Sequence, residues 1–128
     1  MSRSIARVST ALAIQINKQV TGRTPKHYDK TMLDSALDRP VNKAHWEPQS
    51  TISQLAGCLG WSFIMNHPFP DGNKRTAQGV VTEMLKLEGL RFSSKGAKEI
   101  EDAHLKVASS QMDDVGLGEV YAKHIRKA

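Results

Sequence analysis

The chain has 128 residues, enough for one domain with a single ordinary core, and we treat residues 1–128 as that domain. Its 39% apolar and 24% charged content is typical of a globular protein and excludes a disordered one. The net charge of +5 favours an acidic or phosphorylated partner. The basic residues are scattered, so we expect no direct binding of nucleic acid.

The single cysteine, Cys58, excludes an internal disulfide and favours a reducing compartment. We interpret it as a small buried apolar group. No apolar run approaches the roughly 20 residues that a membrane-spanning helix needs, and the N-terminus lacks the apolar core of a signal peptide. These features predict a cytoplasmic protein that does not associate with membranes.

Apolar residues at helical spacing predict a first helix over about residues 4–21, which Gly22 stops. A short second helix is capped by Asp29 and ended by Pro40. Residues 41–47 are predicted to be an irregular loop, of the kind that forms a mobile flap holding a partner segment.

Pro48 suits the first position of a third helix that runs to about residue 66 and is apolar enough to be the central one. Another helix begins near Asn73 and ends before Gly89. The remainder is predicted as an extended link at 90–94, a helix at 97–111, a turn at 113–118 and a last helix carrying Val120, Tyr121 and Ile125.

No stretch alternates with period two. We therefore predict an all-α fold of about six helices, built around two central helices and the loop that joins them.

That loop is the most informative segment of the chain. Residues 67–77 read His-Pro-Phe-Pro-Asp-Gly-Asn-Lys-Arg-Thr-Ala. Pro68 and Pro70 prevent a continuous helix, while Gly72 accepts backbone angles that other residues resist. The sequence therefore predicts a stiff loop that turns sharply into a helix near Asn73.

The first N–H groups of a helix have no intrahelical partner, so this turn favours an anion such as phosphate. Lys74 and Arg75 fall in the first turn, where positive charge disfavours the helix unless an anion is bound. Asp71 offers a hard oxygen for Mg²⁺, and His67 can accept a proton near neutral pH.

The same residues also fit purely structural roles. Asp71 also suits a simple turn, and Lys74 and Arg75 also suit a solvated surface. We interpret Trp46 and Trp61 as packing groups rather than as a platform for stacking bases. No metal-ligand spacing relates the other histidines, which are His27, His45, His104 and His124.

Residues 67–75 resemble the signature of the Fic/Doc (Fido) family, and the Doc branch of "death on curing" toxins is the closer match. Lys74 stands where most Fic enzymes have a second glycine, and Gln78 stands where they usually have a second arginine. Residues 33–40 also resemble a stretch common in Doc-like sequences. Gly72 is the exception, because Doc usually has alanine there.

The resemblance implies a helical Fido fold that transfers part of ATP, with Mg²⁺, to a hydroxyl of a protein substrate. It makes His67 the general base and Asp71 the carboxylate associated with magnesium. The remaining implied roles are a phosphate-binding loop of Gly72, Asn73, Lys74 and Arg75, and packing beneath the loop by Phe69.

Doc toxins phosphorylate a threonine of elongation factor Tu and so block translation, whereas Fic enzymes mostly transfer AMP. We predict the Doc-like reaction, because a lysine at position 74 fills the space that a glycine leaves for phosphates and can change the nucleotide's pose. The alternatives are a Fic-type adenylyltransferase and a non-catalytic Fido domain that binds a nucleotide or protein.

Many Fic proteins carry an inhibitory helix with a Ser/Thr-x-x-x-Glu-Gly/Asn pattern, and this chain has no such pattern. We therefore expect a separate antitoxin protein to inhibit this one. The family resemblance implies that the antitoxin places a helix in a groove near the active site.

Overall fold

The computed structural model describes residues 4–128, and within them it confirms a mostly helical fold. The helices are α1 (Thr10–Thr21), α2 (Lys30–Trp46), α3 (Ile52–Asn66), α4 (Asn73–Leu87), α5 (Ala97–Ala108) and α6 (Asp114–His124). Two short strands, β1 (Leu90–Phe92) and β2 (Ile125–Lys127), pair antiparallel, and a 3₁₀ turn (Ser94–Gly96) precedes α5. Within the described residues, no helix is both long and apolar enough to cross a membrane.

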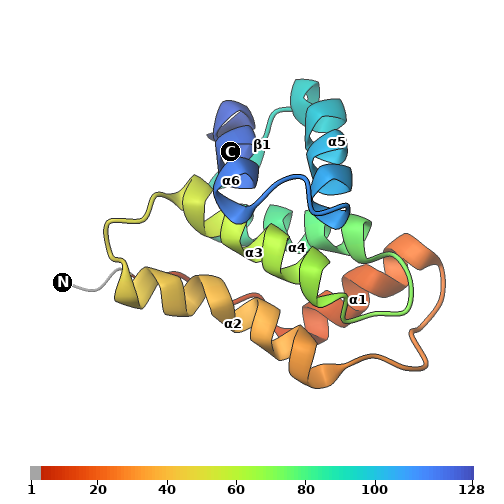
Figure 1. Cartoon of the computed structure of the whole chain (residues 1–128). Helices are drawn as coiled ribbons and strands as arrows, with labels where there is room; N and C mark the ends of the chain where they lie inside the picture. Colours follow the sequence, from red (N-terminus) through yellow and green to blue (C-terminus); the bar gives the residue numbers. More distant parts are fainter. Residues whose placement is uncertain (1–3) are drawn as a thin grey trace.

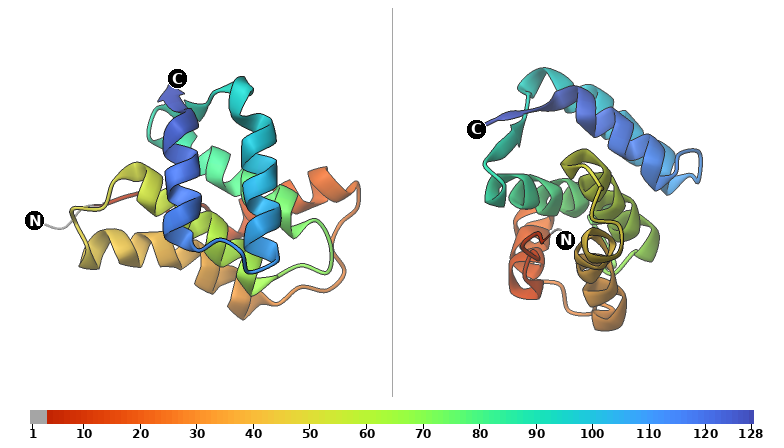
Figure 2. Two further views of the ribbon diagram at one scale, coloured as in Figure 1. Left: turned by 45° about the horizontal axis from the view of Figure 1, so that its top comes forward. Right: turned by 90° about the vertical axis from the view of Figure 1, so that its left-hand side faces the viewer.

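Helix α3 is the centre of the molecule, as its apolar sequence predicts. It packs against α2, α4, α5 and α6 (Figure 1). Helices α1 and α2 lie on one side of the α3–α4 pair, and α5 and α6 lie on the other (Figure 2). The motif loop joins α3 to α4, so both of its ends are fixed by the most extensively packed helices of the fold.

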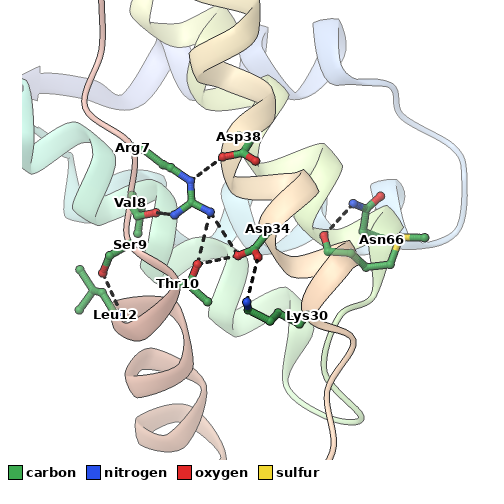
Figure 3. Close-up of polar contacts among 10 residues, drawn as sticks. Arg7, Val8, Ser9, Thr10, Leu12, Lys30, Asp34, Asp38 and Asn66 are labelled. Atoms are coloured by element: carbon green, nitrogen blue, oxygen red, sulfur yellow. Dashed lines mark hydrogen bonds and ion pairs between the residues drawn. The ribbon is translucent and has the colours of Figure 1, made fainter.

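Residues 4–9 are not helical. The Ser9 side chain caps α1 by accepting a hydrogen bond from the Leu12 N–H, so the predicted start of this helix near residue 4 is wrong. Arg7 ties the segment to α2 through ion pairs with Asp38 (2.6 Å) and Asp34 (3.2 Å; Figure 3).

Thr10 also donates to Asp34, at 2.6 Å. This hydrogen bond, together with Lys30 and Arg7, holds the pKa of Asp34 below its usual value. The segment that precedes α1 therefore lies alongside α2, and cannot extend α1.

Helix α2 is longer than predicted, because Pro40 lies inside it. A proline in a helix interior loses one hydrogen bond and costs about 3 kcal/mol. The ring of Pro40 is buried on the same face as Leu33, Leu37 and Ala44, and packing of this face against α3 offsets the cost. The predicted irregular flap at 41–47 is therefore wrong.

The same extension carries Trp46 to the end of α2, where the side chain is 79% exposed. The prediction that Trp46 is a packing group is therefore wrong. Trp61 does pack against the core, with the Arg39 guanidinium 5.5 Å from its ring. Cys58 is buried, as predicted, and burial raises the pKa of its thiol.

Capping side chains make α3 begin later, and α6 begin earlier, than predicted. Thr51 and Gln54 form a capping box, so α3 begins at Ile52 and Pro48 is not its first residue. Asp113 caps α6 by accepting from the Gly116 N–H, at 2.7 Å, so residues 113–118 are not a free turn. At the other boundaries, α5 ends at Ala108 instead of 111, and Ile125 belongs to β2 instead of the last helix.

Glycines 57 and 118 bring α3 and α6 into backbone contact. A Cβ on Gly57 would lie 2.6 Å from the Gly118 backbone nitrogen, and a Cβ on Gly118 would lie 3.0 Å from the Ser53 carbonyl oxygen. Neither obstacle is a movable side chain. The glycines that suggest a turn in the sequence therefore serve a close helix crossing.

We expect Gly57→Ala to lower the free energy of unfolding by about 1–3 kcal/mol, because the added methyl forces α3 and α6 apart. Gly116→Ala is the matched control on α6, since its Cβ would meet the Met112 side chain instead of backbone. Urea unfolding of both variants checks this, and equal losses would contradict the close-contact explanation.

Candidate active site

The motif loop begins and ends on residues with positive φ. His67 ends α3 with φ 48° and ψ 56°, and its N–H donates to the Phe63 carbonyl at 3.2 Å. Gly72 precedes α4 with φ 75°. Between them Phe69 is 1% exposed and packs against Tyr28 and Phe63, with ring centroids 5.7 and 6.1 Å away. Phe69 is therefore a buried anchor of the loop.

Asn73 holds this loop in shape. Its Oδ1 accepts a hydrogen bond from the Phe69 N–H at 3.0 Å, and its Nδ2 donates to the Phe69 carbonyl at 2.7 Å. Nδ2 also lies 3.2 Å from His67 Nδ1. The backbone of Phe69 fixes which amide atom is nitrogen, so His67 Nδ1 must be the acceptor, and the neutral ring carries its hydrogen on Nε2.

The Asn73 side chain is thus engaged inside the loop, and the residue is 6% exposed. Its predicted contact with phosphate can come only from its backbone N–H while these hydrogen bonds persist. The loop and the imidazole are held by one amide, which positions His67 at the protein surface with an exposed side chain.

The N-terminus of α4 has the features of an anion site. It has no side-chain cap, and its first ladder bond runs from the Thr76 N–H to the Gly72 carbonyl at 2.8 Å. Within residues 4–128, the N–H groups of Asn73, Lys74 and Arg75 have no acceptor. Unpaired amides and the positive end of the helix dipole both favour an anion here.

Lys74 and Arg75 line a cleft of about 320 Å³ between α4 and α5, which we call the α4–α5 cleft. Arg75 also donates from Nη1 to the Val20 carbonyl at the end of α1, at 2.6 Å. This contact uses one of its five N–H donors. Arg75 therefore keeps donors free for a ligand while α1 fixes the direction of its side chain.

Asp71 faces a different hollow, of about 330 Å³, which we call the Asp71 hollow. Its carboxylate pairs with Arg23 at 3.2 Å, and both side chains are more than half exposed. Such a pair contributes at most about 1 kcal/mol, so Arg23 does not bar another cation from the carboxylate.

A single carboxylate fits Mg²⁺ when phosphate oxygens and water supply the other ligands. It does not make a complete metal cage, and among the described residues no group of three acidic, His or Cys side chains does either. The structure thus separates the predicted residues: Asp71 lies in one hollow and the two cations lie in another.

Sequence reasoning missed Asn17 of α1. Its Nδ2 donates to the Asp71 carbonyl at 2.9 Å and to Thr76 Oγ1 at 3.1 Å, and the residue is 2% exposed. The signal was present, because Asn17 is a polar residue adjoining the apolar face that carries Ala13 and Ile16. It attaches the motif loop to α1.

Comparison with known proteins identifies the family to which the chain belongs. A model of the Fic/DOC family matches residues 7–85, which include α1 through most of α4 and the whole motif loop. The chain belongs to the Fic/DOC family. Fic/DOC enzymes transfer nucleotide-derived groups to proteins, using a nucleotide and a metal ion. No curated protein gave a significant match to the chain.

The backbone of this Fic/DOC protein explains why position 72 is glycine, where the Doc branch usually has alanine. Gly72 has φ 75°, and a Cβ there would lie 2.7 Å from the Thr21 side-chain methyl. Any side chain would therefore meet both backbone strain and a steric contact with the end of α1.

We expect Gly72→Ala to lower the free energy of unfolding by about 1–3 kcal/mol, from the left-handed backbone and the contact with Thr21. Thr21→Ser removes that methyl but keeps the hydroxyl that donates to the Asn17 carbonyl. In the Thr21→Ser background the loss should shrink, as measured by urea unfolding. A loss of the same size in both backgrounds would show that the contact is unimportant.

Proposed function

We propose that this protein is a Doc-like toxin that transfers the γ-phosphate of ATP to a hydroxyl of a protein substrate. By family resemblance the substrate is a threonine of elongation factor Tu, and the consequence is blocked translation. The proposal includes a separate antitoxin that restrains the toxin by laying a helix in a groove near the motif loop.

The observation that carries the proposal is the α4 N-terminus, where three amides without acceptors adjoin Lys74 and Arg75, two cations that line a cleft. Phosphoryl transfer needs mainly positioning and charge neutralisation, and this arrangement can supply both. Asp71 would hold Mg²⁺, which would supply further positive charge against the phosphates.

Lys74 favours phosphoryl over adenylyl transfer. A glycine at this position would leave open space beside the helix N-terminus, whereas the lysine lines the α4–α5 cleft and adds a charge there. The lysine restricts how far along the helix end a phosphate chain can extend. This supports a pose that brings the γ-phosphorus, rather than the α-phosphorus, to the acceptor hydroxyl.

His67 would take the proton of the acceptor hydroxyl. The exposed ring is open to a protein substrate, but the tautomer set by Asn73 presents Nε2 as a donor. Acceptance at Nε2 therefore requires that the Asn73 contact break and the hydrogen move to Nδ1. Alternatively, the hydroxyl replaces Asn73 at Nδ1. Either route makes Asn73 a positioning residue for the base.

The alternative reaction is adenylyl transfer of the Fic type. Gly72 is the specific feature that favours it, since glycine at this position is Fic-like and the loop backbone requires it. The same base and the same metal-associated carboxylate would serve both reactions, and the two differ in which phosphorus lies in line with the hydroxyl.

A labelling experiment separates the two reactions. The protein is incubated with Mg²⁺, cell lysate and ATP labelled at either the α or the γ phosphate. We expect label from the γ position only on a protein target, and at least a hundredfold less transfer by His67→Ala, because general-base catalysis typically contributes 10²–10⁴-fold.

Lys74→Gly is the informative companion variant, since it reopens the space beside the helix end. We expect it to lose γ transfer and to admit some α transfer. Label from the α position with the wild-type protein would contradict the kinase reaction and establish the adenylyl alternative. Absence of label from both positions would leave the domain as a binding module.

A further inference from the structure

Helix α5 lies outside residues 7–85, the part of the chain that the family model matches, yet it forms one wall of the α4–α5 cleft. From α4 the cleft receives Lys74, Arg75 and Gln78, and from α5 it receives Glu101, His104 and Leu105. Glu101 is one carboxylate against two cations, so the residues that line the cleft carry a net positive charge. His104 is the exception among the α5 residues, because it is 2% exposed.

His104 is held from behind by a buried tyrosine. Its Nε2 lies 2.6 Å from the hydroxyl oxygen of Tyr121, and the two rings meet edge to face. Tyr121 is fully buried, and Gly60 makes room for its hydroxyl, since a Cβ at that position would collide with the oxygen. The pair joins α5 to α6 against α3.

Burial decides the charges of this pair. It lowers the pKa of His104 to about 4, so the imidazole is neutral at neutral pH. It also raises the pKa of Tyr121 well above its usual value, so the hydroxyl keeps its hydrogen. The short contact is therefore a hydrogen bond between two neutral groups.

The direction of that hydrogen bond follows from what each group has to satisfy. If the Tyr121 hydroxyl donates to Nε2, its hydrogen is paired, and His104 carries its own hydrogen on Nδ1. If Nε2 donates instead, a fully buried hydroxyl hydrogen has no acceptor, which costs about 1–3 kcal/mol. The first arrangement is favoured because Tyr121 is fully buried, whereas His104 lines the cleft. Within residues 4–128 the Nδ1–H that this arrangement creates has no acceptor.

We propose that His104 is a specificity-determining residue of the α4–α5 cleft, donating a hydrogen bond from neutral Nδ1–H to an oxygen of a polyphosphate held beside Lys74 and Arg75. The proposal rests on the proposed function for the identity of the ligand. It adds to the ligand-binding residues one that lies outside the motif loop and outside residues 7–85, which the family model matches. Tyr121 is then a positioning residue, because it acts on the ligand only through the tautomer of His104.

A neutral donor suits this place better than a third cation would. Lys74 and Arg75 already supply charge, and a charged imidazole beside them would cost repulsion and desolvation. A rigid N–H fixed by Tyr121 gives direction instead of charge. It would favour a phosphate chain over a compact anion, because His104 belongs to the α5 wall of the cleft and Lys74 and Arg75 belong to the α4 wall.

The first measurement uses the wild-type protein at neutral pH. Long-range ¹H–¹⁵N NMR of the histidine rings should show His104 as the Nδ1–H tautomer, and inorganic tripolyphosphate should shift its Nδ1 resonance. The Nε2–H tautomer would overturn the proposal. So would an unmoved Nδ1 resonance when the amides of Lys74 and Arg75 do shift.

The second measurement is calorimetric titration of variants with tripolyphosphate. His104→Gln keeps an oxygen that can accept from the Tyr121 hydroxyl and removes the Nδ1–H, so we expect about tenfold weaker binding from the loss of one hydrogen bond to a charged acceptor. His124→Gln is the matched control, because His124 pairs with Glu99 outside the cleft. Tyr121→Phe should also weaken binding, but less.

Equal affinities of wild type and His104→Gln would overturn the proposal, and if the variant does not fold, the NMR measurement on the wild type decides. The proposed function fails separately. Absence of label transfer with an intact His104 effect removes the transferase, whereas transfer without a His104 effect removes only this inference.

Discussion

The structure of the site depends on the side-chain amide of Asn73. It pairs with both backbone groups of Phe69 and reaches His67, so one buried residue closes the loop and orients the candidate base. Because the loop is neither helix nor strand, its backbone groups need such a partner. Without it the amides at the start of α4 and the imidazole at the end of α3 would have no fixed relation.

A second constraint comes from α1, which supports the loop from outside. Asn17 binds the Asp71 carbonyl and the Thr76 hydroxyl, Val20 accepts from Arg75, and Thr21 limits position 72 to glycine. In turn, α1 is preceded by the segment that Arg7 ties to α2. The loop is thus held by α1, α3 and most of α4, which lie within the matched region, whereas α5, outside it, adds one wall of the cleft.

The sequence predicts the motif loop and its two flanking helices well, because prolines, glycine and apolar periodicity act locally there. It fails where tertiary packing overrides a local signal. Pro40 stays inside α2 because its ring is buried against α3, and Gly118 lies in a helix because α6 must approach α3 closely. The sequence marks Asn17 as a polar residue beside an apolar face, but the partners of Asn17 and His104 cannot be read from it, since they lie more than fifteen positions away.

The most direct test of this account is a crystal structure of the protein with Mg²⁺ and a non-hydrolysable ATP analogue. We predict phosphate oxygens within hydrogen-bond distance of the N–H groups of Asn73, Lys74 and Arg75, with the Asn73 side chain still bound to Phe69. A polyphosphate bound instead in the Asp71 hollow, among Arg23, Lys26 and His27 and away from those amides, would contradict it.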